Sequence, residues 1–193
     1  MLRSIRQDLT VQHADADFME EVCEISALRA LANGDWPTFA ACAPTVRKRP
    51  RAGELAWLLL LGSSPLARTC ALRDFLESNS ATAKFVRMVL ADIGAGSWMR
   101  ALRRSPPTEV AAQAFAIAVK PLASAHIFAA ATKAFPSLRT DTLRRLGVKE
   151  LPAGLEVTEG IVNCKRAHMQ APALINAALK PTQRDDHSRE FLR

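Results

Sequence analysis

Clusters of basic residues are the side chains in this sequence best suited to bind a ligand. In chain order they are Arg47, Lys48, Arg49 and Arg51; Arg100, Arg103 and Arg104; Arg144 and Arg145; and the smaller pair Lys165 and Arg166. Guanidinium and ammonium groups donate charge-assisted hydrogen bonds to phosphate oxygens, so these clusters predict contact with a nucleic-acid backbone. The first cluster is the leading hypothesis, because Pro50 breaks it into a loop and nothing acidic is adjacent in the sequence. The others are predicted near helix ends, where cations also offset the helix dipole.

Residues that could support catalysis or metal binding are few. Cys164 and His168 stand four apart on a predicted helix, as two metal ligands would, but no second pair accompanies them. A buried thiol and a surface histidine are therefore the expected interpretation. The run Asp185-Asp186-His187 lies on a charged tail without a rigid scaffold, and no nucleophile or phosphate-loop motif is present. The sequence predicts a non-enzyme with no metal, no cofactor and no small-molecule substrate.

The charge is unevenly distributed along the chain. The net charge is +7, yet the first 35 residues hold seven acidic side chains and three arginines, which leaves +11 for the remainder. A basic body favours an anionic partner, of which nucleic acid is the commonest. The alternative is that the arginines serve only solubility.

Cysteine usage and hydropathy bear on the compartment. The four cysteines lie far apart and none belongs to a CxxC pair, which favours a reducing compartment without disulfides. No apolar run approaches the ~20 residues that cross a bilayer, so no membrane insertion is predicted. The opening MLRSIRQDL has the arginines and spaced apolar residues of an organellar transit peptide, although Asp8 cuts the pattern short. It points to an organellar location, the alternative being another reducing intracellular compartment.

The elements that must position these residues follow a repeated pattern. Residues 23–42 read CEISALRALANGDWPTFAAC, and residues 84–105 read KFVRMVLADIGAGSWMRALRRS. Gly34 and Trp36 of the first stretch correspond to Gly96 and Trp98 of the second, an offset of 62 residues. Each stretch predicts a helix that ends at a glycine turn and a second helix that opens at the tryptophan. Half the offset, about 31 residues, places further hairpins around Ala67 and Ala129.

The whole chain is expected to be all-α. β-branched residues are sparse, and no segment alternates with period two. Besides the hairpin over 84–105, helices are predicted over about 15–32, 36–46, 54–61, 66–77, 109–120, 122–135, 140–146, 155–169 and 172–180. We interpret these as an α-solenoid of stacked helical hairpins, with an irregular helical bundle as the alternative. The expected organisation is an N-terminal arm over 1–13, a helical-repeat domain over 14–146, a helical extension over 147–180 and a charged tail over 181–193.

The repeated unit, LRALANGDWPTFAA and VLADIGAGSWMRAL, resembles the pentatricopeptide and tetratricopeptide repeat families. The resemblance covers about residues 14–146 in degenerate form. It implies a helical scaffold in an organellar ribonucleoprotein such as a mitochondrial ribosome, contacting RNA and neighbouring proteins. The positions that would read bases in the pentatricopeptide family hold Glu24 and Val86. Neither is a small polar residue, so a side-chain code for RNA sequence is not expected.

Two functions from different classes follow. In the first, the chain is a structural subunit of a large ribonucleoprotein that touches RNA backbone through its basic clusters, with affinity that falls steeply with salt. In the second, it is a protein–protein adaptor in a membrane-associated or other multi-subunit complex without RNA contact, and its arginines pair with acidic patches on neighbours.

Overall fold

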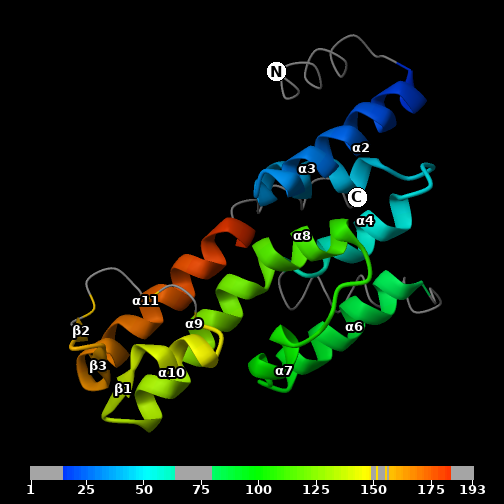
Figure 1. Ribbon diagram of the computed structural model, residues 1–193. Helices are drawn as coiled ribbons and strands as arrows, with labels where there is room; N and C mark the ends of the chain where they lie inside the picture. The colour runs from blue at the N-terminus through cyan, green and yellow to red at the C-terminus, as the bar shows by residue number, and fades with distance from the viewer. Residues whose placement is uncertain (1–14, 64–79, 149–150, 152–154, 156, 184–193) are drawn as a thin grey trace. The chain divides into compact units, whose positions relative to one another are not determined.

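A computed structural model describes residues 15–63, 80–148, 151, 155 and 157–183 (Figure 1). This part of the chain is mostly helical, as predicted. Its elements are α2 (Ala16–Ala32), α3 (Trp36–Cys42), the 3₁₀ helix η1 (Ala43–Thr45), α4 (Ala52–Leu59), α6 (Ala81–Gly94), α7 (Trp98–Leu102), α8 (Glu109–Ala118), α9 (Lys120–Ala134), β1 (Ser137–Arg139), α10 (Thr140–Arg145), β2 (Val157–Thr158), β3 (Ile161–Asn163) and α11 (Cys164–Gln183). The predicted arm over 1–13, the predicted helix over 66–77 and most of the predicted tail lie outside the described residues.

The chain forms two compact units. Unit 1 comprises residues 1–87, 105–118 and 182–193, and unit 2 comprises residues 88–104 and 119–181. The first boundary falls inside α6. Another falls at Val119, between α8 and α9, two residues before Pro121, which was expected to divide two helices but lies in the first turn of α9.

Unit 1 has an apolar core where α2 packs on α3 and α8, and α4 packs on α8. The large buried side chains of this core are Leu31, Trp36, Phe39, Leu55, Trp57, Leu58, Leu61, Phe85 and Phe115. The rings of Phe85 and Phe115 meet edge to face at 5.6 Å. Full burial of a large apolar side chain contributes about 1.5–3 kcal/mol. The leucine-rich helix α4 was predicted to lie centrally, and its Leu55 and Leu58 are fully buried.

A glycine turn ends α2. Gly34 has a φ of +73°, in the left-handed region that favours glycine. Its N–H donates to the carbonyl of Leu31 at 3.2 Å, and the N–H of Asp35 donates to the carbonyl of Ala30 at 2.8 Å. These two bonds form a Schellman cap, which satisfies carbonyls that the helix end leaves free. The Asp35 Oδ1 then accepts the N–H of Thr38 at 3.1 Å and caps α3.

The same turn ends α6, 62 residues further along the chain. Gly96 has a φ of +69°, and its N–H donates to the carbonyl of Ile93 at 2.9 Å. The N–H of Ser97 donates to the carbonyl of Asp92 at 2.8 Å. The two predicted hairpin turns therefore have the same backbone hydrogen bonds at corresponding positions.

The tryptophan after each turn opens a helix and anchors it in its own unit. The Trp36 ring is 2% exposed and lies 5.0 Å from the Phe39 ring. The Trp98 ring stacks on His126 at 4.1 Å, nearly parallel. The 31-residue step does not extend to Ala129, which lies inside α9 rather than at the start of a helix. The position at Ala67 is outside the described residues.

The core of unit 2 joins α7, α9, α10 and α11 to a small sheet. It contains Ile127, Phe128, Ala131, Leu143, Val148, Val162, Ala167 and Ala171, with Trp98, Met99 and Leu102 packed against it. The Ser124 hydroxyl donates to the carbonyl of Gly147 at 3.0 Å, which ties α9 to the turn after α10. Leu138 of β1 and Val162 of β3 attach the sheet to this core.

The sheet was not predicted. Its strands are antiparallel in the order β1-β3-β2, with Ser137 opposite Asn163 and Arg139 opposite Ile161. The expected helix over 155–169 is wrong in its first half, because β2 and β3 occupy it and α11 begins only at Cys164. From there α11 continues through Pro172, so the two helices expected over 155–169 and 172–180 are one.

Within the described residues, no single helix has the length and apolar composition to cross a bilayer. Helices α8 and α9 meet those criteria only when counted together across the break between them.

Candidate nucleic-acid interface

The loop predicted to bind phosphate is held against the acidic helix α2 of unit 1. The Oε2 of Glu20 accepts the backbone N–H of Lys48 at 2.8 Å and that of Arg47 at 3.1 Å. The hydrogen bond from Lys48 is the main reason that the pKa of Glu20 lies below its ordinary value, against the opposing effect of burial. An acidic side chain therefore fixes the backbone of the basic loop.

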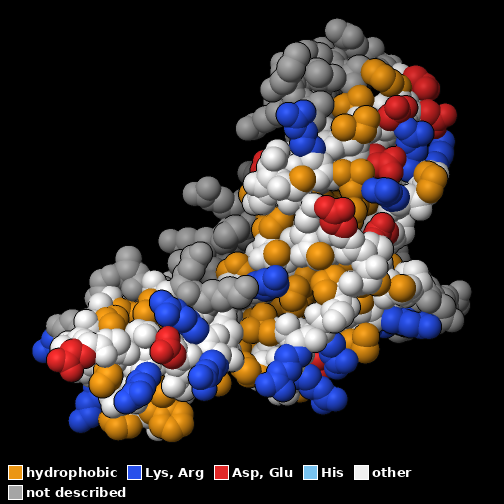
Figure 2. All heavy atoms as spheres, viewed as in Figure 1, with side chains coloured by type: hydrophobic (Ala, Val, Ile, Leu, Met, Phe, Trp, Pro, Cys, Tyr) orange, Lys and Arg blue, Asp and Glu red, His pale blue; other side chains and the backbone are white. Residues whose placement is uncertain are grey.

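Side chains of the same loop are paired with further acids of α2. Arg49 contacts Glu21 at 2.8 Å and Glu24 at 3.4 Å, and the Lys48 ammonium lies 3.6 Å from Asp17. The absence of adjacent acids in the sequence therefore does not leave these cations unpaired, because the acids come from a helix far upstream in sequence. Figure 2 shows the two charge types interleaved over α2 and the loop before α4.

The remaining basic side chains of this cluster are unpaired within the described part of the chain. Arg47 and Arg51 are exposed and form no ion pair with a described residue. Of the four predicted loop residues, two are thus paired with acidic side chains of α2, and two are exposed to solvent where a phosphate could reach them.

The second cluster surrounds a buried acid in unit 2. Asp92, which is 7% exposed, accepts a hydrogen bond from Arg104 Nε at 2.8 Å and lies 3.6 Å from Arg100 Nε. The Arg104 hydrogen bond lowers the pKa of Asp92, and the pKa of Arg104 is raised in turn. A carboxylate in the last turn of α6 opposes the helix dipole, so the two arginines offset an otherwise unfavourable charge. Arg103 is exposed and forms no ion pair with a described residue.

The third cluster lies at the sheet end of unit 2. Arg144 contacts Asp141 at 3.3 Å, but both side chains are well exposed, so this pair contributes little. Arg145 is exposed, as are Arg139 on β1 and Lys165 in the first turn of α11. Figure 2 shows several Lys and Arg side chains over this end of unit 2, among hydrophobic and acidic ones, and a cluster of them over α7.

The whole net charge of the chain belongs to unit 2. This unit holds 12 of the 26 Lys and Arg residues but only 5 of the 19 Asp and Glu residues, which gives +7. Unit 1 holds the other 14 basic and 14 acidic residues and is neutral. The electrostatic footprint expected of a nucleic-acid-binding surface therefore lies on unit 2.

The outer face of the three-stranded sheet is hollowed. The depression has a volume of about 380 Å³ and is lined by Pro136, Ser137, Thr158, Glu159, Ile161 and Asn163. Leu138 and Val162 point to the core, and the residues that alternate with them face outward, as a half-buried sheet requires. Glu159 and Gly160, with φ of +51° and +76°, form the two-residue turn of the hairpin.

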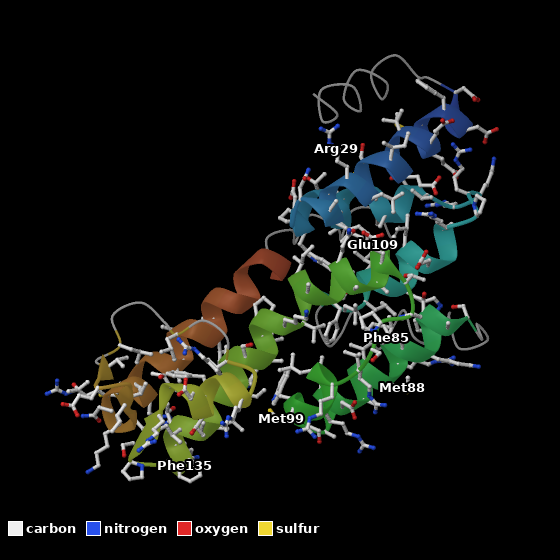
Figure 3. The ribbon with its side chains drawn as sticks, viewed as in Figure 1. Arg29, Phe85, Met88, Met99, Glu109 and Phe135 are labelled. Carbon is white, nitrogen blue, oxygen red and sulfur yellow. The ribbon has the colours of Figure 1, made fainter. Side chains whose placement is uncertain are left out.

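An exposed aromatic residue directly precedes Pro136, which lines this hollow. Phe135 ends α9 in an extended conformation, immediately before Pro136, and is 52% exposed. Its ring points away from the core of unit 2 (Figure 3). Neither Phe135 nor the hollow was among the predicted site residues, because a helix was expected to end at Phe135 and another to span 155–169, where β2 and β3 lie.

The predicted cysteine–histidine pair does not converge on a common site. Cys164 is fully buried and its Sγ donates to the carbonyl of Val162 at 3.7 Å, whereas His168 is exposed. Burial raises the pKa of the Cys164 thiol. Among the described residues, no group of three or more His, Cys, Asp or Glu side chains could hold a metal ion. The run at 185–187 lies outside the described residues.

The two residues at the positions that the family resemblance marks for base reading have other roles in the structure: one forms an ion pair and the other packs in the interior. Glu24 contacts Arg49, and Val86 is fully buried. Comparisons of this chain with protein-family models, with curated proteins and with solved structures gave no match. A function for the chain therefore has to be inferred from its own physical features.

Proposed function

We propose that this chain is a non-catalytic helical scaffold that contacts RNA backbone through unit 2. The distribution of charge carries the proposal. Unit 2 has a net charge of +7 and exposed cations on α7, β1, α10 and α11, while unit 1 is neutral and two of its loop cations are paired with α2. Binding of this kind releases counterions, so affinity should fall steeply as salt rises.

The experiment compares two double variants of the full chain. Removing the charges at Arg103 and Arg145, which are exposed and form no ion pair with a described residue, should weaken binding to single-stranded RNA and reduce the slope of log affinity against log salt by about 1.4. Removing those at Lys48 and Arg49 should leave the slope unchanged, because these cations are already paired with acids. Fluorescence anisotropy at several salt concentrations measures both. No salt-dependent binding by the wild-type chain would refute the proposal, and loss of binding only in the loop variant would move the site to unit 1.

The wider setting follows from the family resemblance. A scaffold of stacked hairpins that contacts RNA and protein suits a ribonucleoprotein assembly, and a mitochondrial ribosome is the assembly we propose. The matching Schellman turns at Gly34 and Gly96 support a hairpin repeat with a 62-residue spacing. Purification of the native complex, followed by a test for co-purifying RNA, addresses this part of the proposal.

A protein–protein adaptor is the second candidate function, and one observation favours it. Phe18 and Ile25, two turns apart on α2, are 50% and 52% exposed. Apolar side chains at this spacing share a helix face and could dock on a neighbouring protein. If the chain is such an adaptor, charge removal in unit 2 would leave complex assembly intact and RNA would be irrelevant.

A further inference from the structure

We propose that the hollow on the outer face of the sheet in unit 2 holds one unpaired base of a single-stranded RNA, with Phe135 beside it as a stacking platform. This inference rests on the proposed function and deepens it, because it names the form of RNA and the contact that distinguishes a base from a phosphate.

The floor and rim of the hollow have the chemistry of a base site. Ile161 provides an apolar surface, and the side chains of Ser137, Thr158 and Asn163 make no hydrogen bond with another described residue. Hydroxyl and amide groups can each donate and accept, as the edges of bases require. A volume of about 380 Å³ lies at the small end of ligand sites, which suits a single planar ring system.

Phosphate groups on either side of such a base would meet cations. The strand register places Arg139 directly opposite Ile161, and Arg139 is exposed without an ion pair to a described residue. Lys165 follows β3 by two residues and is also exposed. The carboxylate of Glu159 lines the turn end of the hollow and would repel a phosphate there. The base edge rather than the backbone should therefore face Glu159.

Phe135 supplies the second element of recognition. Stacking of a base on an aromatic ring contributes about 1–3 kcal/mol and is a recurring feature of single-strand recognition. Phe135 is half-exposed and comes one residue before Pro136, which lines the hollow, so its ring is available without any movement of the core. Bases inside a duplex are stacked on each other and cannot reach it, so single strands should bind better than duplexes.

The test uses the full chain and a matched pair of phenylalanine variants. Phe135→Ala removes the proposed platform, and Phe18→Ala removes a phenylalanine of nearly equal exposure, 50% against 52%, from unit 1. We expect Phe135→Ala to weaken single-stranded RNA binding roughly tenfold with an unchanged salt slope, and Phe18→Ala to have no effect. Heparin, a polyanion without bases, should bind the wild type and Phe135→Ala equally.

Asn163→Ala provides an independent variant that leaves Phe135 in place, and circular dichroism checks that each variant is folded. Asn163→Ala should weaken single-stranded RNA binding and leave heparin binding unchanged. Equal affinity of the wild type for single-stranded and duplex RNA, or equal loss of RNA and heparin binding in Phe135→Ala, would overturn the inference while the proposed backbone contact stands. No RNA binding at all would overturn both.

Discussion

Replacing Gly62 by alanine should destabilise unit 1, because the added methyl group has no room beside Trp36. Gly62 follows α4 and is buried. A Cβ placed on its backbone would lie against the six-membered ring of Trp36 and 2.6 Å from Nε1. The indole is 2% exposed and packs on the Phe39 ring at 5.0 Å, so it cannot swing into solvent to make space.

The expected cost follows from the cost of overpacking a core. Forcing one extra methyl group into a well-packed interior destabilises a protein by about 1–3 kcal/mol. For a chain of 193 residues this corresponds to a fall in melting temperature of roughly 2–12 °C. Differential scanning calorimetry or a thermal melt followed by circular dichroism would measure the change.

Gly53→Ala is the matched control. Gly53 lies in the first turn of α4, has no positive φ, and a methyl group added there would have open space around it to 4 Å. The same substitution there should raise stability by up to about 1 kcal/mol, since alanine favours the helix and restricts the unfolded chain. If Gly62→Ala proves as stable as Gly53→Ala, the Trp36 ring does not lie against Gly62, and the packing of the first hairpin is incorrect.

Three further predictions concern unit 2. The pKa of Asp92 is lower in the folded chain than its ordinary value. Its contribution to the free energy of unfolding is therefore present above the ordinary pKa and is lost as pH falls through the folded value. Asp92→Asn should be less stable than the wild type at neutral pH and should lose less stability on acidification, as measured by urea titrations. Burial lowers the pKa of His126 from 6.5, so unit 2 should lose stability as pH falls from above 6.5 through the lowered value, and His126→Phe should flatten that loss in thermal melts. Glu159 has a φ of +51°, which asparagine tolerates better, so Glu159→Asn should raise the melting temperature slightly; a decrease would contradict the assigned turn.

Most helices of the described chain could be predicted because local signals mark their ends. Asp15 and Gly34 bound α2, and Asp35 with Pro37 marks the start of α3, to within a residue or two of the expected limits. The end of the helix expected over 36–46 is wrong, because α3 stops at Cys42 and the 3₁₀ helix η1 follows it. Pro121 likewise marks the first turn of α9. Caps and prolines act on neighbouring backbone groups only, so the sequence alone displays them.

The sheet could not be predicted because none of its signals extends far enough along the chain. Its strands have two or three residues each, too few for an alternating pattern to stand out. The turn between β2 and β3 is Glu159-Gly160, which lacks the Asn-Gly or Asp-Gly pair that usually marks a tight hairpin. β1 pairs with β3 across more than twenty residues of sequence, and this long-range pairing fixes the register.

The basic loop shows why the site, like the sheet, could not be predicted from local sequence alone. Its four cations were the strongest cluster by sequence, yet Lys48 and Arg49 are paired with acids that α2 supplies. The acidic character of the first 35 residues was visible in the sequence, but their contact with the loop is a tertiary contact that the sequence does not display. The hollow was missed for the same reason as the sheet that forms it, and Phe135 was missed because it was assigned to the end of a helix.

The acidic side chains, more than the basic ones, distinguish the two units in the field that each would present to a polyanion. The two units have similar numbers of Lys and Arg residues, 14 and 12, but 14 and 5 Asp and Glu residues. At physiological salt, exposed charges are screened beyond about 8 Å, so a cation within a few ångströms of a carboxylate presents almost no field to an approaching phosphate. Lys48 and Arg49 are in that situation, whereas Arg139, Arg145 and Lys165 have no such partner among the described residues. Counting basic residues thus favours the loop, and counting unpaired ones favours unit 2.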